Sequence, residues 1–311
     1  MTFKRIKTGI LWLSFFVIFS PAAQAFADAA PDPLHKGITP ARKSSRVQMI
    51  SEQVDIYLGT KRCDFEVSFQ MKNPTITAES LEVGFPTSYE NEVKNPIVRI
   101  NDRRVKTRPG IEKEIERIEV DGKEYTKIHS THWILWDMTF EPEETQTLTM
   151  SYWVKPAYNS DVVVTPYTRY MHAITDEFRS KRKEMPEEVS RLISAVKSYS
   201  TGYILVTGSG WDGIIENAVI TVYHKEKGAG VVRWFDPRDN VTFSKNRMMW
   251  DLSFFEPDFD ITIEFNGGHT VDEEIALVEK AIPATDCREA LQEFQSYLYG
   301  LRDLIKSKAQ D

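Results

Sequence analysis

Residues 136–142 read WDMTFEP, and the chain repeats nearly the same phrase at residues 250–257, which read WDLSFFEP. An alternating run of apolar and polar residues follows each phrase, at residues 147–152 and 260–265. Such alternation is typical of a half-buried strand, so each copy predicts a strand, a Glu-Pro turn and a second strand. The copies lie 114 residues apart, which favours two related β-domains in tandem.

Similar alternation elsewhere predicts the fold class. Apolar and polar residues alternate strictly over residues 63–71, and Asp121-Gly122 is a strong signal for a two-residue hairpin turn. We predict a mainly β protein with two tandem antiparallel β-sandwich domains of immunoglobulin-like type, at residues 46–158 and 201–268. Between them, residues 159–200 have apolar residues at helical spacing and predict a helical insert.

The carboxylates of the repeated phrase, Asp137, Glu141, Asp251 and Glu256, could be interpreted as an acid and base pair in each copy. Two copies would then require the same chemistry twice in one chain. The structural interpretation needs only a Trp that fills a core and a Glu-Pro pair that opens a turn, because proline fixes φ and donates no ladder hydrogen bond. We therefore interpret the phrase as part of the scaffold.

The N-terminus predicts export. Within residues 1–25, three basic residues precede an apolar run of about ten residues and a small-residue cleavage site. Cleavage is predicted after Ala25, with Ala27 as the alternative. The apolar run is shorter than the roughly 20 residues of a membrane-spanning helix, so an uncut anchor is less favoured. Residues 26–45 are predicted to be a flexible lead-in, and the mature protein to be periplasmic or extracellular.

Net charge limits the classes of partner. The chain carries a formal charge of −7, and loss of the three basic residues in the signal peptide would bring it to −10. This sign opposes binding to phosphate backbones, so nucleic acid is not an expected partner. An anionic membrane surface is disfavoured for the same reason. No later apolar stretch reaches spanning length, so no membrane span is expected after cleavage.

The chain has two cysteines, Cys63 and Cys287. An exported protein can keep a disulfide, so this pair is a disulfide candidate. Each cysteine also lies on an apolar face of its predicted element, and two buried thiols are the alternative. The sequence does not decide between them.

The C-terminal segment, residues 269–311, predicts a helix. Apolar residues recur at heptad spacing over residues 287–305, and Asp286 with Glu289 could form a capping box. A helix packed on a β-domain is favoured over an intermolecular coiled coil, because the seam is short and Gly300 interrupts it.

Residues 208–213 read GSGWDG and form the most distinctive loop. Its glycines could project the Trp211 ring toward a ligand, as exposed binding loops do. The alternative is a β-turn whose Trp folds back over the core. Trp211, Asp212 and Glu216 are the ligand-binding candidates, and no catalytic residue is predicted.

No metal site or cofactor is predicted. His129 and His132 have a spacing found among metal ligands, but positions three apart on a strand point to opposite faces. The sequence has neither a Gly-x-Ser-x-Gly nor a His-Glu-x-x-His motif.

Two further runs carry a family resemblance: Tyr203-x-Leu205-x-Thr207-Gly208-x-x-Trp211-x-Gly213, and Trp250 followed by Glu256-Pro257-x-x-Asp260. Together with the signal peptide, they make the chain similar to a family of uncharacterised exported bacterial β-sandwich proteins. The resemblance covers most of the mature chain and implies a fold and a compartment, but no activity and no catalytic residues.

The sequence thus favours a non-enzymatic exported protein that binds a protein or ligand partner in the cell envelope. One alternative is a hydrolase of envelope carbohydrate that uses carboxylates near Trp211, such as Asp212 and Glu216. Another is a structural component that assembles through the seam at residues 287–305.

Overall fold

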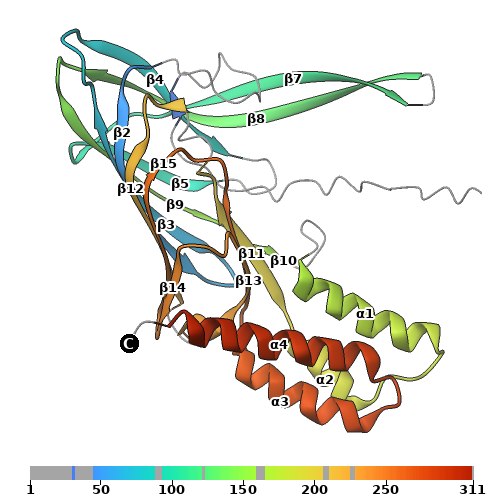
Figure 1. Ribbon diagram of the computed structural model, residues 1–311. Coiled ribbons are helices and arrows are strands. Elements are labelled where there is room, and N and C mark those ends of the chain that lie inside the picture. Colours follow the sequence, from blue (N-terminus) through green and yellow to red (C-terminus); the bar gives the residue numbers. More distant parts are fainter. Residues whose placement is uncertain are drawn as a thin grey trace, which may run out of the picture.

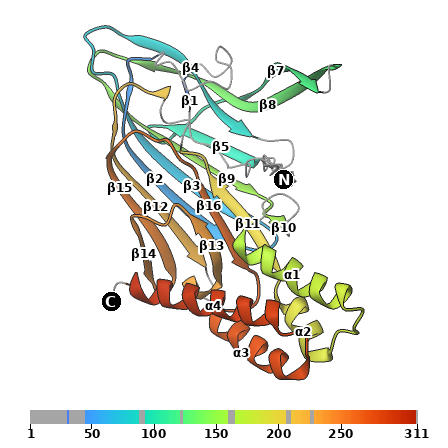
Figure 2. The ribbon, with the colours of Figure 1, turned by 45° about the vertical axis from the view of Figure 1, so that its right-hand side comes forward.

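The computed structural model describes residues 30–31, 45–87, 93–120, 123–158, 165–205, 210–224 and 228–309. Within these ranges the chain is mainly β, with three sheets and four α-helices. Figures 1 and 2 show the sheets stacked in the upper part of the molecule and the helices gathered at the lower end.

The largest sheet has eight strands among the described residues. Neighbouring strands are antiparallel except for one parallel pair, β12 with β2. In spatial order they are β14 (Val241–Ser244), β15 (Arg247–Phe255), β12 (Ile215–His224), β2 (Gln48–Leu58), β3 (Cys63–Lys72), β9 (Thr145–Val154), β5 (Lys94–Ile100) and β6 (Arg103–Arg104).

Two four-stranded sheets complete the β part. The first has the order β1 (Ala30–Pro31), β4 (Glu79–Thr87), β8 (Lys123–Phe140) and β7 (Arg108–Val120). The second has the order β10 (Ala157–Tyr158), β11 (Ser198–Tyr203), β16 (Ile261–Asn266) and β13 (Val232–Asp236). Inward-facing side chains of all three sheets form one hydrophobic cluster.

The alternation predicted for residues 63–71 is confirmed by β3. Its apolar residues, from Cys63 to Met71, are buried in the cluster, and the polar residues between them are more exposed. One face of the strand therefore contributes to the core and the other meets solvent, as expected for an outer layer of an antiparallel sheet.

Two separate immunoglobulin-like sandwiches are not confirmed. β12 belongs to the block at residues 201–268, yet it pairs with β2 of the block at residues 46–158, from Asn217 opposite Ser51 to His224 opposite Leu58. This pairing joins the two blocks into one continuous sheet over one shared core. The helical insert lies between the blocks in sequence without dividing their cores.

The repeated phrase makes the same structural step twice. In the first copy the chain leaves β8, turns and enters β9 in the eight-stranded sheet; in the second it leaves β15 of that sheet and enters β16. Trp136 and Trp250 are buried. The two predicted strands are confirmed in each copy, with a turn at residues 142–143 in the first. Each copy carries the chain from one sheet into another.

The helices form a second hydrophobic cluster. They are α1 (Pro166–Ser180), α2 (Glu187–Ala195), α3 (Val271–Ala281) and α4 (Glu289–Ser307), with short 3₁₀ turns η3 (Gly228–Val231) and η4 (Ile282–Ala284). The seam predicted for the C-terminal helix is buried inside this cluster, where α4 packs against α1 and α3. A packing helix is confirmed, and the seam is not free to form an intermolecular coiled coil.

A buried ion pair joins the helices to the sheets. Arg233 of β13 lies 2.8 Å from Glu274 of α3, and both side chains are fully buried. Tyr167 of α1 and Asn266 of β16 also donate hydrogen bonds to Glu274. Four elements therefore meet at one carboxylate, and loss of Arg233 would leave the buried charge of Glu274 without a counter-ion.

Of the two alternatives for the cysteines, the structure shows two buried thiols and no disulfide. Cys63 and Cys287 are both free and buried, and they lie in different clusters, one between the sheets and the other among the helices.

The predicted capping box at Asp286 and Glu289 is also not formed. α4 begins after Arg288 without a side-chain cap of its own, and Asp286 pairs with Lys183 instead. The signal peptide, nearly all of the lead-in and the Asp121-Gly122 turn lie outside the described residues.

Candidate functional site

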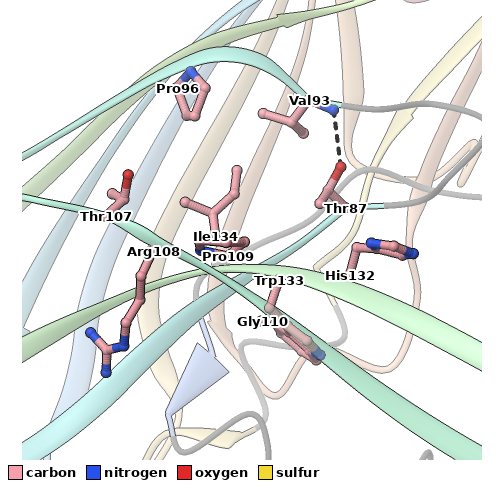
Figure 3. Close-up of a pocket in the computed structure, with 10 residues that line it drawn as sticks. All are labelled: Thr87, Val93, Pro96, Thr107, Arg108, Pro109, Gly110, His132, Trp133 and Ile134. Atoms are coloured by element: carbon pink, nitrogen blue, oxygen red, sulfur yellow. Dashed lines mark hydrogen bonds between the residues drawn. The ribbon is translucent and has the colours of Figure 1, made fainter.

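A groove opens at the base of a long β-ribbon. β7 and β8 extend beyond the rest of their sheet as a two-stranded arm (Figure 1), and the groove lies where this arm meets β5. Its volume is about 700 Å³. The lining residues are Thr87, Val93, Pro96, Thr107, Arg108, Pro109, Gly110, His132, Trp133 and Ile134 (Figure 3).

One side of the groove is formed by the end of β4 and the start of β5. A hydrogen bond and a shift in strand register shape the backbone there. The hydroxyl of Thr87, at the end of β4, accepts a hydrogen bond of 2.9 Å from the backbone N–H of Val93. The register of β5 then shifts between Lys94 and Ile97, where Asn95 has a φ of 52°. Asparagine tolerates this left-handed conformation better than most residues. Pro96 follows and lines the groove.

The interior is mostly apolar with a few polar groups. In Figure 3 the Ile134 side chain extends toward Pro96, while Arg108 and Trp133 extend away from β5. Thr87, Thr107 and His132 provide hydroxyl and imidazole groups along the lining. The space between β5 and the arm is therefore bounded by small or apolar side chains, with hydrogen-bonding groups at separate points.

Arg108 fixes the base of the arm from the other side. Its guanidinium donates two hydrogen bonds to Asp137, of 3.1 and 3.0 Å, and a further one to Glu82. These contacts link β7, β8 and β4 across the sheet. All three side chains are partly exposed, so the ion pairs add little to stability; their forked geometry sets the position of the groove-lining backbone.

The residues proposed from the GSGWDG loop do not line this groove. Trp211 is only 1% exposed and belongs to the core. Asp212 donates its backbone N–H to the carbonyl of Val47, and Glu216 is exposed on β12. Of the two interpretations of the loop, the structure shows the Trp folded over the core.

The carboxylates of the repeated phrase have structural or solvent-facing positions. Asp137 pairs with Arg108, and Asp251 and Glu256 are exposed. The N–H of Glu141 donates to the carboxylate of Glu144 within the turn. The buried rings of Trp136 and Trp250 agree with the scaffold interpretation of the phrase.

A metal site has no support among the described side chains. No group of three or more His, Cys, Asp or Glu residues is placed there to hold an ion. His132 lines the groove, and the side chain of His129 lies outside the description.

Sequence reasoning missed the groove because its residues come from four separate segments. The usable signals were weak: prolines at positions 96 and 109 interrupt strand patterns, and proline in a sheet is confined to edges and bulges. The pairing of β8 with both β4 and β7, together with the packing of β5 beside them, brings these segments together.

Comparison with known proteins gives distant structural likeness only. No family model and no curated protein matches the sequence. Among solved structures, the chain is similar to a proposed nutrient binding protein from Legionella pneumophila, with 15% identity, a TM-score of 0.46, and coverage of 91% of this chain and 84% of that one. It is also similar to yeast LTA4 hydrolase, with 9% identity, a TM-score of 0.35, and coverage of 72% and 31%.

An M1 zinc metallopeptidase from Deinococcus radiodurans gives 8% identity, a TM-score of 0.31, and coverage of 73% and 44%. The chain thus spans less than half the length of either enzyme.

None of the helices in the described part of the chain has the length and apolar character needed to cross a membrane.

Proposed function

We propose that this chain is an exported, non-enzymatic protein that binds a ligand in the bacterial cell envelope, and that the groove at the base of the arm is its binding site. The observation that carries the proposal is the groove itself. Its volume of about 700 Å³ is within the range of small-molecule sites, which combine apolar walls with a few placed polar groups.

The lining indicates the chemical class of ligand. Val93, Pro96 and Ile134 offer apolar contact, and Thr87 and Thr107 offer hydroxyls. None of the groove-lining residues named above has a carboxylate or an ammonium group, and Arg108 is already engaged by Asp137 and Glu82. A molecule with a mainly apolar body and one or two uncharged polar groups therefore fits better than a highly charged one.

The binding proposal can be tested by thermal shift and calorimetry with a panel of small amphiphilic molecules, half of them uncharged and half carrying two or more charges. We expect uncharged members to raise the melting temperature. Thr107→Trp should abolish this effect, because position 107 precedes β7 and a large ring there would enter the groove. Thr145→Trp, at an exposed position at the start of β9, is the matched control.

The proposal fails if no member of the panel binds, or if Thr107→Trp binds as tightly as the wild type while remaining folded. If the highly charged members bind more tightly, the proposed ligand class is wrong. The groove would still be the binding site if Thr107→Trp abolishes that binding.

The compartment is a separate proposal, which rests on the basic and apolar residues of positions 1–25. Expression of the full chain in a bacterial host, followed by fractionation and N-terminal sequencing, tests it. We expect protein in the periplasm or medium that begins after Ala25 or Ala27. Intact protein in the cytoplasm would contradict export.

A further inference from the structure

A second surface, made of other residues than the groove, carries two exposed apolar side chains. Ile214 is 48% exposed and Phe254 is 72% exposed. Ile214 directly precedes β12 and Phe254 is next to the last residue of β15, and the pair formed by Ile215 and Phe255 brings these two strand ends together. Large exposed apolar groups that lie together mark interaction surfaces more often than single ones do.

The backbone at Phe254 is unusual. Its φ is 51°, in the left-handed region that disfavours bulky side chains. A ring that is mostly in solvent contributes little to the core that could compensate for this strain. Strained residues that the fold does not need are a recurrent feature of binding sites.

Three carboxylates lie within two residues of Ile214 or Phe254 in the sequence. Glu216 and Glu256 are exposed, and Asp212 is partly exposed. Neither residues 210–223 nor residues 248–260 contain a Lys or Arg. On the adjacent segment, Arg46 precedes the Val47 carbonyl that bonds to Asp212, and its guanidinium is paired with Glu79. This charge repels a second copy of the same surface and an anionic lipid surface, and it complements a cationic partner.

We propose that Ile214, Phe254, Asp212, Glu216 and Glu256 form a docking surface, here called the acidic apolar patch. Its partner is a polypeptide segment that presents apolar side chains flanked by Lys or Arg. The apolar pair provides the contact area, and the carboxylates select the partner by charge. This inference does not depend on the groove or its ligand.

A fluorescence anisotropy titration tests the patch with two labelled helical peptides. One is built from Lys and Leu, and the other has Glu in place of Lys with the same length and apolar content. We expect the Lys peptide to bind, and its affinity to fall at least tenfold in the double variant Glu216→Lys/Glu256→Lys. Ile76→Ser is the control, since Ile76 is 84% exposed between β3 and β4, outside the patch.

Phe254→Gly separates a binding role from a structural one. Glycine adopts a φ of 51° without a side-chain penalty, so the melting temperature should stay the same or rise. Binding of the Lys peptide should nevertheless fall at least tenfold. A variant that gains stability and loses affinity is the signature of a residue kept for docking.

Three results would overturn the proposal. The first is absence of Lys-peptide binding to the wild-type protein. The second is equal binding by wild type, Phe254→Gly and the double variant, which would indicate diffuse attraction to an acidic protein. The third is self-association of the wild type that Phe254→Gly abolishes, because the occupant would then be a second copy of the chain.

Discussion

Two glutamates in the interior have an unusual environment. Glu52 of β2 is 2% exposed and accepts a hydrogen bond from the Tyr203 hydroxyl, while its other carboxylate oxygen has no partner among the described residues. Glu264 of β16 accepts hydrogen bonds from Thr165 and Ser198. Burial raises the pKa of each carboxyl from 4.5 to about 7. Both are therefore proton-binding groups in the folded protein.

The raised pKa values make stability depend on pH. Between pH 4.5 and pH 7 the folded state holds protons that the unfolded state releases, so the contribution of Glu52 to stability is lost as pH rises through this range. The free energy of unfolding of wild type should fall from pH 5 to pH 8, and that of Glu52→Gln should not. The difference between the two proteins should therefore change by roughly 2 kcal/mol in favour of the variant over this range. Urea unfolding at the two pH values measures this. Glu66→Gln, on the exposed side of β3, is the control, and an equal effect of both variants at both pH values would contradict the prediction.

Trp211 illustrates how a distinctive residue can belong to the scaffold. Since its ring is buried in the core, Trp211→Ala should lower the free energy of unfolding by about 3–5 kcal/mol. Trp211→Phe should cost less because it keeps most of the apolar volume. Chemical denaturation of the three proteins checks this order. A stable, fully folded alanine variant would instead indicate an exposed ring.

At the scale of elements, α4 depends on another helix for its N-terminal cap. Its own N-terminus lacks a side-chain cap, but the carboxylate of Glu177 in α1 accepts the backbone N–H of Ala290. A negative charge there also meets the positive end of the helix dipole. The contact therefore connects α1 and α4 as well as satisfying a backbone donor.

Removing this cap should loosen the helical cluster. Glu177→Ala is expected to cost about 1 kcal/mol, as for other lost caps, measured by thermal unfolding. Asp176→Ala removes a neighbouring acidic side chain that is largely exposed, so it should stay within about 0.5 kcal/mol of wild type. Equal losses in both variants would show that the cap does not matter.

The β7–β8 arm extends beyond the sheet that carries its base (Figure 1), and we expect it to contribute little to the stability of the core. Beyond the pair formed by Ile111 and His132, the two strands pair only with each other. Replacing residues 112–131 by Asn-Gly should leave the melting temperature within a few degrees of wild type and preserve ligand binding in the groove. A large loss of stability would show that the arm contacts the body of the protein.

At the scale of the whole molecule, one hydrophobic cluster lies between the sheets and a second lies among the helices. Cys63 belongs to the first and Cys287 to the second. Burial raises the pKa of the Cys63 thiol to about 12, which keeps it protonated and unreactive. Iodoacetamide should therefore label neither cysteine of the native, non-reduced protein and both cysteines in guanidinium chloride. Intact mass spectrometry counts the labels, and a denatured protein that resists labelling until reduced would reveal a disulfide.

Patterns in the amino-acid sequence were enough to predict much of the local structure. Alternation predicted β3, the repeated phrase predicted two strand–turn–strand steps, and heptad spacing predicted the packing face of α4. Each pattern reports whether a side chain meets core or solvent within its own element, and that is a local property.

How these elements combine could not be predicted from such patterns and is known from the three-dimensional structure. The parallel pairing of β12 with β2 turned two expected sandwiches into one sheet, and it joins segments more than 160 residues apart. The groove likewise requires Thr87, Pro96 and Ile134 to converge from different strands. Periodicity shows which face of a strand is buried but not which distant strand lies beside it, so the partners and the sites they form follow from long-range packing.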